Sequence, residues 1–289
     1  MPANTPTDRL TPARISQLER LAAESRIKII EMIARAGSGH PAGSLGMTDV
    51  LTVLYHEILN HKPNKPDWPG RDYFLLSNGH ICPALYAVLN SVGYFPSIEL
   101  KSLRKLNSRL QGHPVKGSPP GVENTSGPLG QGLSQACGVA LALKSDQKSN
   151  RVYCMMSDGE QQEGQTWEAY MLAAKYQLDN LTGIIDRNFI QIEGKTEEIM
   201  PLETLSAKIS SFGLVVYEID AHDISLIYQT IQLANKDNKP SIIIANSTPG
   251  KGVSFMENDH RWHSGSLSEE QTKQALGELT QKLNNQSKQ

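Results

Sequence analysis

The sequence predicts an α/β fold, in which a mostly parallel sheet carries helices on both faces. Short apolar runs rich in β-branched residues alternate with helical patterns along the chain. The clearest unit lies within residues 151–192, where the run Val152–Met156, a helical pattern and the run Leu181–Ile185 follow one another. A strand, a helix and a strand in this order form a βαβ unit. The length and the ordinary apolar content fit one domain over residues 1–289.

The first half of the chain is mainly helical. Thr11 and Pro12 predict an N-cap followed by proline at the first helical position. Apolar spacing carries this helix to about Ala36, and the segment Gly37–Pro41 ends it. The further elements expected in this half are helices at 48–58, about 82–92 and about 98–106, and a strand at 73–77.

In the second half, strands and helices alternate. We expect a helix at 133–143 before the βαβ unit, and after it strands at 214–219 and 241–246 with helices near 202–211, 223–236 and 268–283. The polar ends, residues 1–12 and 284–289, are expected to be flexible.

Composition excludes several classes of function. The formal charge of −2 gives no reason to expect nucleic acid or an anionic membrane as partner. No window of eighteen apolar residues predicts a transmembrane helix, and the first residues lack the apolar core of a signal peptide. Cys82, Cys137 and Cys154 are scattered, without a CxxC pair. We therefore expect buried, reduced thiols and a cytoplasmic protein.

Polar side chains follow both strands of the βαβ unit. The first strand breaks into Asp158 and Gly159, and the second into a segment that contains Asn188. Because the carboxyl ends of parallel strands meet at one edge of the sheet, these residues should lie together. Carboxylate and amide oxygens suit Mg²⁺ or Ca²⁺, and Gly159 lets the backbone approach a phosphate. The simpler alternative is a structural unit with Asp158 as a helix cap and Asn188 as a turn residue.

A long loop, residues 111–133, contains six glycines and four prolines. Long irregular loops in compact domains are often functional. Its last part, Gly127–Gly132, precedes a predicted helix, and a glycine-rich loop at a helix N-terminus can bind an anion. It lacks the lysine of a P-loop and follows no clear strand, so neither a Walker A site nor a Rossmann site fits.

Four histidines lie in predicted loops beside glycine, proline or serine: His40, His80, His113 and His263. Any one of them alone is better explained as a surface or hydrogen-bonded residue. Histidine is nevertheless well suited to proton transfer near neutral pH.

The segment after the first strand of the βαβ unit resembles the thiamine diphosphate motif. In that motif Gly-Asp-Gly and an Asn about thirty residues later hold the metal and the diphosphate. Ser157 stands where the family usually has Gly. Seven segments, in the family's order, also resemble transketolase: GSGHP at 37–41, LSNGH at 76–80, QGHP at 111–114, GPLGQG at 127–132, SDGEQQEG at 157–164, DRNFI at 186–190 and WHSG at 262–265.

The resemblance implies roles for individual residues. The implied ligands of Mg²⁺, which Ca²⁺ or Mn²⁺ can replace, are Asp158, Asn188 and the carbonyl of Ile190. The implied contacts to thiamine diphosphate are His80, Gly127, Pro128, Leu129, Gly159, Glu160, Asn188 and His263. The implied catalytic residues, which hydrogen-bond substrate hydroxyls and move protons, are His40, His113 and His263. Glu163 resembles an acid at the interface between cofactor-binding domains.

The resemblance also shows what this chain lacks. A transketolase continues into a pyrimidine-binding domain and a C-terminal domain, which supply the Glu that activates the cofactor and most groups that bind a sugar phosphate. We therefore expect the N-terminal subunit of a split transketolase. Its partner would be a C-terminal subunit, in a heterotetramer with two copies of each chain. Together they would transfer a two-carbon ketol unit between sugar phosphates.

Three other interpretations stay open. A subunit of another thiamine diphosphate enzyme, such as a deoxyxylulose-phosphate synthase or a 2-oxoacid dehydrogenase, would share the metal motif but not the histidines. A non-catalytic partner subunit would not need to retain Asp158, Asn188 and all four histidines. A nicotinamide-binding Rossmann protein would need GxGxxG after its first strand, and the sequence has none there.

Overall fold

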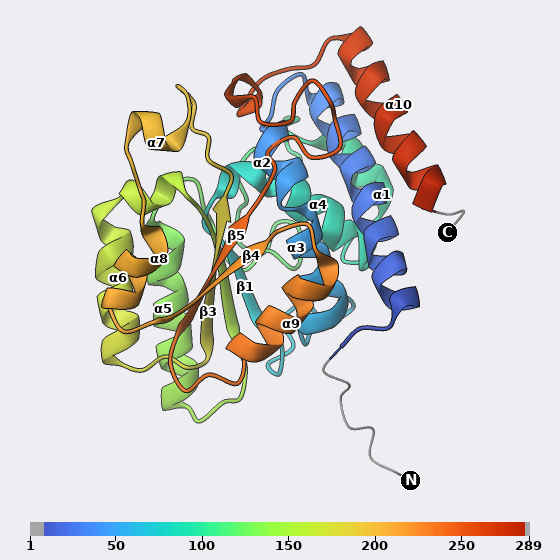
Figure 1. Ribbon diagram of the computed structural model, residues 1–289. Coiled ribbons are helices and arrows are strands. Elements are labelled where there is room, and N and C mark those ends of the chain that lie inside the picture. Colours follow the sequence, from blue (N-terminus) through green and yellow to red (C-terminus); the bar gives the residue numbers. More distant parts are fainter. Residues whose placement is uncertain (1–8, 287–289) are drawn as a thin grey trace.

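The structure, a computed structural model that describes residues 9–286, is built on a five-stranded sheet (Figure 1). The strands lie in the order β1-β2-β3-β5-β4, and every neighbouring pair is parallel. Their bounds are β1 (Tyr73–Leu76), β2 (Val152–Ser157), β3 (Leu181–Arg187), β4 (Val215–Asp220) and β5 (Ser241–Asn246). The predicted fold class is confirmed.

Helices cover both faces of the sheet (Figure 1). One face is covered by α5 (Gln131–Ser145), α6 (Gly164–Lys175) and α8 (Leu205–Ser211). The other is covered by α2 (Pro41–Gly46), α3 (Thr48–Val53), α4 (Cys82–Ser91) and α9 (Ile224–Ala234). Outside this second layer, α10 (Glu269–Gln286) packs against α1 (Pro12–Ala36).

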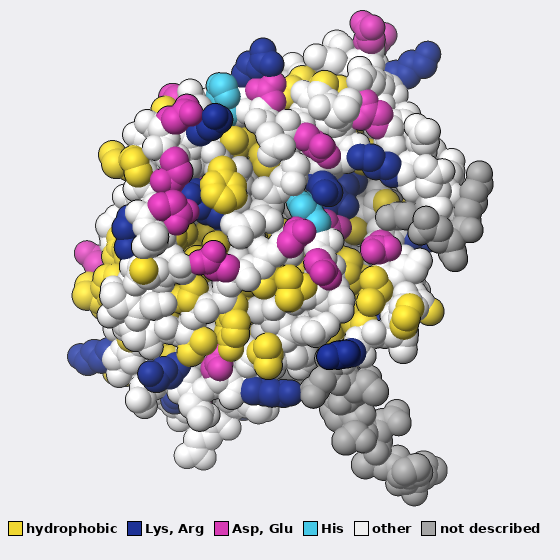
Figure 2. Space-filling model, in the orientation of Figure 1, with side chains coloured by type: hydrophobic (Ala, Val, Ile, Leu, Met, Phe, Trp, Pro, Cys, Tyr) yellow, Lys and Arg dark blue, Asp and Glu magenta, His cyan; other side chains and the backbone are white. Residues whose placement is uncertain are grey.

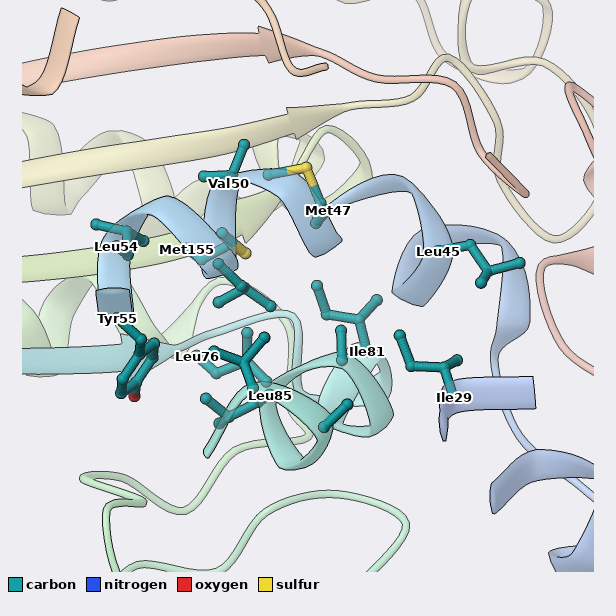
Figure 3. Packing of buried hydrophobic residues seen from close by; sticks show 14 of the residues in the cluster. Ile29, Leu45, Met47, Val50, Leu54, Tyr55, Leu76, Ile81, Leu85 and Met155 are labelled. Carbon is teal, nitrogen blue, oxygen red and sulfur yellow. The ribbon is translucent and has the colours of Figure 1, made fainter. Parts of the chain in front are cut away.

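Strands β2, β3 and β5 are mostly apolar because both of their faces are buried, whereas the edge strand β4 is largely half-buried or exposed. In β2, Tyr153 and Met155 point into the layer that contains α1 to α4, whereas Cys154 and Met156 point toward α5 and α6. Figure 3 shows the first of these layers, where Met47 and Val50 of the α2–α3 segment pack with Leu76 at the end of β1 and with Met155. This packing fixes the ends of the strands, where the polar residues lie.

Most predicted elements are present, with some differences at their ends. The Thr11 cap is confirmed, because its hydroxyl accepts a hydrogen bond from the Arg14 backbone N–H at 3.2 Å. Pro41 does more than stop α1, since it also starts the short helix α2, where a missing N–H costs nothing. The helix expected at 98–106 is a 3₁₀ helix at Ser97–Ser102, and α7 (Thr196–Ile199) was not predicted.

Helix α1 begins at Pro12, as predicted, and α10 continues to Gln286, past its expected end at 283. The rest of the predicted flexible ends, residues 1–8 and 287–289, lies outside the described residues. The three cysteines are buried and unpaired, as predicted. Within residues 9–286, the helices are all too short or too polar to cross a bilayer.

Helix α5 approaches strand β1 very closely at Gly132. A Cβ atom at this position would lie 2.3 Å from the Ser77 Cβ, so only glycine fits without a shift. The close approach lets the Gly132 backbone N–H donate to the Ser77 hydroxyl at 3.0 Å. The contact therefore joins the start of α5 to the carboxyl end of β1.

We expect Gly132→Ala to lower the free energy of unfolding by about 1–3 kcal/mol, the usual cost of overpacking a core. Gly138→Ala, in the same helix, is the matched control, because a Cβ there meets no atom within 4 Å. The control should be neutral or stabilising by up to about 1 kcal/mol. Urea unfolding of both variants measures the difference, and equal midpoints would show that α5 can move away from β1.

Candidate active site

The carboxyl ends of the central strands form a row of polar groups. Parallel pairing continues past the strands, because the Asp158 N–H donates to the Asp186 carbonyl and the Ser247 N–H to the Arg187 carbonyl, both at 3.0 Å. Asp158, Asn188 and Ser247 therefore follow three adjacent strands, β2, β3 and β5. The predicted meeting of Asp158 and Asn188 at one edge agrees with this topology.

The Asp158 carboxylate is only 1% exposed, and its two oxygens differ. Oδ2 accepts three hydrogen bonds, from Arg187 Nη1 at 2.9 Å, the Phe189 N–H at 2.9 Å and the Thr196 hydroxyl at 3.1 Å. Oδ1 accepts only the Gly159 N–H, at 2.8 Å. Burial raises the pKa of Asp158, and Arg187 opposes that shift. The carboxylate is thus fixed, with a lone pair of Oδ1 left for another ligand.

Asn188 is held between two groups of its own segment. Its Nδ2 donates to Asp186 Oδ2 at 2.9 Å, and its Oδ1 accepts the Ile190 N–H at 3.0 Å. Ile190 pairs with Lys195 in an antiparallel bridge whose hydrogen bonds are carried by the neighbouring residues. In such a pair the N–H and C=O of the central residue point away from the bridge. The Ile190 carbonyl therefore faces the same side as its N–H, toward Asn188.

These oxygens fit the predicted metal. Across residues 9–286, no three His, Cys, Asp or Glu side chains gather into a metal-binding group. The donor set here is instead one carboxylate, one amide oxygen and one peptide carbonyl. Hard oxygen donors with room for water and phosphate suit Mg²⁺, Ca²⁺ or Mn²⁺ rather than zinc. The lone pairs left on Asp158 and Asn188 agree with this assignment.

Asp186 is a buried carboxylate beside these ligands, and its importance was not predicted from the sequence. The Ser247 hydroxyl donates to its Oδ1 at 2.5 Å, and Asn188 donates to its Oδ2. Burial is the main cause that raises the pKa of Asp186, to about 7. Its position two residues before Asn188 in the DRNFI segment was the available signal. Asp186 thus orients the Asn188 amide, whose oxygen keeps one lone pair beyond the bond from Ile190.

The four loop histidines identified in the sequence lie together. The His40 ring centroid is 5.2 Å from that of His80, 6.1 Å from His113 and 5.6 Å from His263, and the His80 and His263 centroids are 5.2 Å apart. A two-way backbone bridge between Gly39 and Gly265 joins the loops of His40 and His263. Segments from both ends of the chain thus complete the cluster.

Burial keeps these imidazoles neutral near pH 7. It lowers the pKa of His40 to about 4, with smaller contributions from His263, His113 and Arg104. Burial and the neighbouring imidazoles lower the pKa of His80 well below its ordinary value. The pKa values of His113 and His263 are also lowered, mainly by burial. A neutral imidazole both donates and accepts a hydrogen bond, which is what hydroxyl recognition and proton transfer require.

Glu160 joins three segments of the site. Its buried carboxylate accepts hydrogen bonds from the Ser77 hydroxyl at 2.5 Å, the Gly130 N–H at 2.7 Å and the Ser157 N–H at 2.8 Å. Its oxygens are therefore engaged by the protein, and its predicted contact with a cofactor stays a prediction. Glu163, three residues later, is exposed, and its place at an interface stays a prediction.

The glycine-rich loop lies beside the histidine cluster. A Cβ built on Gly127 would be 3.7 Å from the His113 ring. The next residues, Pro128 and Leu129, are held to α6 because Gln165 donates to the Leu129 carbonyl at 2.7 Å. The loop thus connects the histidines to the start of α5.

Two buried polar side chains near His80 have no hydrogen-bond partner in the described structure. Asn78 is fully buried, yet neither its Oδ1 nor its Nδ2 is paired, and the Ser126 hydroxyl is unpaired as well. Ser126 packs on Gly79, since a Cβ there would be 2.4 Å from its Oγ. Buried polar groups without partners are costly, so these atoms indicate a place for a bound polar molecule. The LSNGH segment contained this signal, but only His80 in it was predicted to have a role.

Arg187 is another residue whose importance was not predicted. Its side chain is 2% exposed and pairs with Asp158 at 2.9 Å, Glu197 at 2.6 Å and Glu203 at 2.8 Å. Its guanidinium also lies 4.1 Å from the Phe189 ring centroid. These contacts tie the segment around α7 to the predicted metal ligand. Phe189 has a φ of 63°, so backbone strain lies directly between Asn188 and Ile190.

Comparison with known proteins gives the family. Residues 18–285 match the family described as "Transketolase, thiamine diphosphate binding domain". A relative from Phocaeicola vulgatus, named as one subunit of apulose-4-phosphate transketolase, is 38% identical over 93% of this chain and 96% of its own length. A relative from a Clostridium species, named 6-deoxy-6-sulfo-D-fructose transketolase subunit SqwG, is 41% identical over 91% of this chain and 96% of its own length.

Solved structures agree. The transketolase of Campylobacter jejuni superposes with a TM-score of 0.86 at 37% identity, covering 91% of this chain and 42% of that enzyme. Fold and site therefore define a thiamine diphosphate binding domain. The chain belongs to the transketolase family, and it spans less than half of this solved transketolase but nearly the full length of the subunit relatives.

We expect Asp158→Asn to weaken Mg²⁺-dependent binding of thiamine diphosphate by at least about 100-fold, because loss of a direct ligand should exceed the loss of an outer-shell partner. The amide keeps the shape of the buried side chain, so the fold should survive. Asp179→Ala is the control, because Asp179 is an exposed carboxylate just before β3, at the opposite end of the strand. Calorimetry on the purified protein with and without Mg²⁺ measures the effect, and equal affinities would refute the metal assignment.

The depressed histidine pKa values predict a pH dependence of stability. Unfolded His40 binds a proton near its ordinary pKa of 6.5, whereas folded His40 binds one only near 4. The unfolded state therefore holds more protons in this window, and the free energy of unfolding should fall as pH is lowered from 6.5 toward 4. Asp186 contributes with the opposite sign, but equally in both proteins compared.

His40→Gln should therefore lose less stability over this range than the unaltered chain. Urea unfolding at several pH values gives both curves, and parallel curves would show that His40 protonates normally in the folded state.

Proposed function

We propose that this chain is the diphosphate-binding, N-terminal subunit of a two-chain transketolase, which transfers a two-carbon ketol unit from a ketose to an aldose. The observation that carries the proposal is the meeting of two constellations at one edge of the sheet. The predicted metal ligands follow β2 and β3, and the four-histidine cluster begins after β1. The subunit relatives, of nearly the same length, support a chain of this extent.

In this proposal Asp158, Asn188 and the Ile190 carbonyl hold Mg²⁺, and the diphosphate lies against Gly159 and the Gly127–Leu129 turn. Asn78 and Ser126 supply further polar atoms that a bound cofactor or its water would satisfy. Thiamine diphosphate, when bound, supplies the carbanion chemistry that permits cleavage beside a ketose carbonyl. The role of this chain is to neutralise and orient the cofactor.

The histidines act on the sugar. His40, His113 and His263 hydrogen-bond its hydroxyl groups and move protons to and from its oxygens, while His80 packs against His40 and His263 and contacts the cofactor. Their neutral state at pH 7 supports this role, because each ring can accept one proton and donate another. Close packing of the rings also holds them in one orientation, which favours catalysis.

A partner chain is the second part of the proposal. Apolar side chains are exposed around the site, most of them within residues 189–200: Leu129, Phe189, Ile192, Ile199 and Met200. Exposed apolar groups around a site commonly mark a protein interface. We propose that a C-terminal transketolase subunit covers this surface, with Glu163 at the contact, in a heterotetramer of two copies of each chain. The face drawn in Figure 2 carries acidic, basic and apolar side chains close together.

The names of the relatives suggest the class of substrate. One is named for a sugar phosphate and the other for a sulfo-sugar, so both names denote anionic sugars. We propose a sugar phosphate or a similarly charged sugar as the substrate of this chain with its partner, in the cytoplasm.

The isolated chain should be inactive and should gain activity only with the partner. The reason is that residues 9–286 build one domain, with the cofactor edge open to a second one. The measurement is a ketol-transfer assay with thiamine diphosphate, Mg²⁺, a ketose phosphate and an aldose phosphate, on the chain alone and after addition of a C-terminal subunit. Partner plus Asp158→Asn is the control for contaminating activity. Robust turnover by the single chain would overturn the two-chain proposal.

A further inference from the structure

His222, which follows strand β4, has both of its ring nitrogens engaged inside the fold. Its Nδ1 lies 2.8 Å from Asp49 Oδ2 in α3, and its Nε2 lies 2.8 Å from the Thr248 backbone nitrogen, past the end of β5. A backbone N–H can only donate, so Nε2 accepts, and the ring proton must be on Nδ1, where Asp49 accepts it. The two contacts therefore define one state, the neutral ring with its proton on Nδ1.

Asp49 is itself held on a rigid support. Arg26 of α1 binds both of its oxygens, with Nη1 on Oδ1 at 3.0 Å and Nη2 on Oδ2 at 2.6 Å, and Arg26 Nε donates to the Leu45 carbonyl at 3.1 Å. Burial acts to raise the pKa of Asp49, but Arg26 and His222 outweigh it and lower that pKa. Asp49 is therefore an ionised acceptor, and it fixes the orientation of the imidazole.

The segment on the other side of His222 reaches the predicted metal ligands. Ser247, directly before Thr248, donates its hydroxyl to Asp186 Oδ1, and Asp186 Oδ2 accepts from the Asn188 amide. A shift of Thr248 would carry the neighbouring Ser247 hydroxyl with it. Asp186 would then lose a donor, and the Asn188 amide would lose its fixed partner.

Three hydrogen bonds determine where this segment lies. Backbone groups tie Ser247 to the end of β3 at 3.0 Å and Gly250 to α2 at 2.9 Å. The third bond, from the Thr248 N–H to His222, is made by a side chain. The backbone contacts are open to almost any sequence, whereas the third needs an acceptor at this place. His222 is thus the position where a single substitution can release the segment.

An aspartate and a histidine in contact can also form a general base, but this pair has no nitrogen left for that task. A general base needs a lone pair that faces the proton to be removed. The Nε2 lone pair of His222 is used by the Thr248 N–H, and Nδ1 carries the proton that Asp49 accepts. The pair therefore acts within the fold.

We propose that His222 is a positioning residue for the metal site. It fixes the Ser247–Thr248 segment, whose hydroxyl holds Asp186, and Asp186 keeps the Asn188 amide in the orientation that leaves an oxygen lone pair for a cation. This inference rests on the proposed function and adds a support that extends from α1 and α3 to the metal ligands. Partners that orient a ligand affect metal affinity without touching the metal.

The tautomer can be measured on the unaltered chain. The imidazole ¹⁵N signals of His222 at pH 7 should show a protonated Nδ1 and an unprotonated Nε2. A proton on Nε2, or on both nitrogens, would mean that Thr248 does not donate to the ring, and it would overturn the inference.

The affinity test uses calorimetry with thiamine diphosphate and Mg²⁺ on purified variants. His222→Phe should weaken Mg²⁺-dependent binding by about 10-fold, the lower end of the range for partners that orient a metal ligand. His222→Gln keeps one donor and one acceptor and should restore most of the affinity. The matched control is His61→Phe, because both nitrogens of His61 are also bonded, to the Tyr94 hydroxyl at 3.1 Å and the Tyr55 carbonyl at 2.8 Å. Equal affinities of His222→Phe and His61→Phe would overturn the inference.

If His222→Phe does not fold, His222→Asn replaces it, because the shorter amide cannot reach both Asp49 and Thr248. The route is tested with Ser247→Ala, which should weaken binding by about 10- to 100-fold. The double variant should bind no more weakly than Ser247→Ala alone. Additive losses would show that His222 does not act through Ser247, and would overturn the inference.

A measurement without metal separates this inference from the proposed function. The Asn188 side-chain amide signals in the NMR spectrum should shift in His222→Phe and in Ser247→Ala, but not in His61→Phe. If Asp158→Asn leaves Mg²⁺-dependent binding unchanged while these shifts are present, the metal assignment is rejected and the connection from His222 to Asn188 is kept. Unchanged Asn188 signals in His222→Phe would overturn the connection itself.

Discussion

The buried ion pair between Asp158 and Arg187 is the interaction on which the site depends. A carboxylate that binds a cation must stay ionised, yet burial at the end of β2 favours its protonated form. Arg187 compensates by donating to Asp158 at 2.9 Å, and two further donors complete the shell of the same oxygen. Loss of Arg187 would leave the buried Asp158 charge uncompensated, and breaking a buried pair in this way typically costs about 3–5 kcal/mol. Arg187 also pairs with Glu197 and Glu203, so the geometry around Asp158 and that of the α7 segment are set together.

Glu160 is a second buried carboxylate that connects several segments of the site. Its carboxylate accepts hydrogen bonds from the ends of β1 and β2 and from the start of helix α5. Three donors on one buried carboxylate favour its charged form, against the burial that raises the pKa of Glu160. Gly132 supports the same arrangement. Without a side chain at this position, α5 comes close enough for its N-terminus to reach Ser77. Two buried carboxylates therefore hold the segments at the carboxyl ends of the strands in place. Asp158 does so through an arginine, and Glu160 does so mainly through backbone amides.

The sequence was sufficient where local pattern and spacing determine structure. Strand β5 was predicted with its observed bounds, because a β-branched run buried on both faces has few alternatives. Asp158 and Asn188 could be placed together because parallel strands share an edge, and the histidines because their neighbours resemble a family. Arg187 and Asn78 could not be identified in this way. Arg187 matters because of the ion pairs that tertiary packing gives it, and Asn78 because packing buries it without a partner. Neither property is visible in the spacing of residues along the sequence. The same holds for Asp186, whose role depends on Ser247 at the end of another strand.

The division of labour between rigid and exposed parts follows from these contacts. The predicted metal ligands lie at or just past the strand ends, where one buried ion pair and several hydrogen bonds hold them before anything binds, so little reorganisation is needed. The surrounding apolar side chains, such as Phe189 and Ile192, face outward from loops. Covering them would exclude water from the rim and lower the local dielectric, which strengthens each hydrogen bond already in place. Further burial would also favour the neutral histidines more strongly. A partner surface at this rim would thus complete a site whose polar half is already organised in this chain.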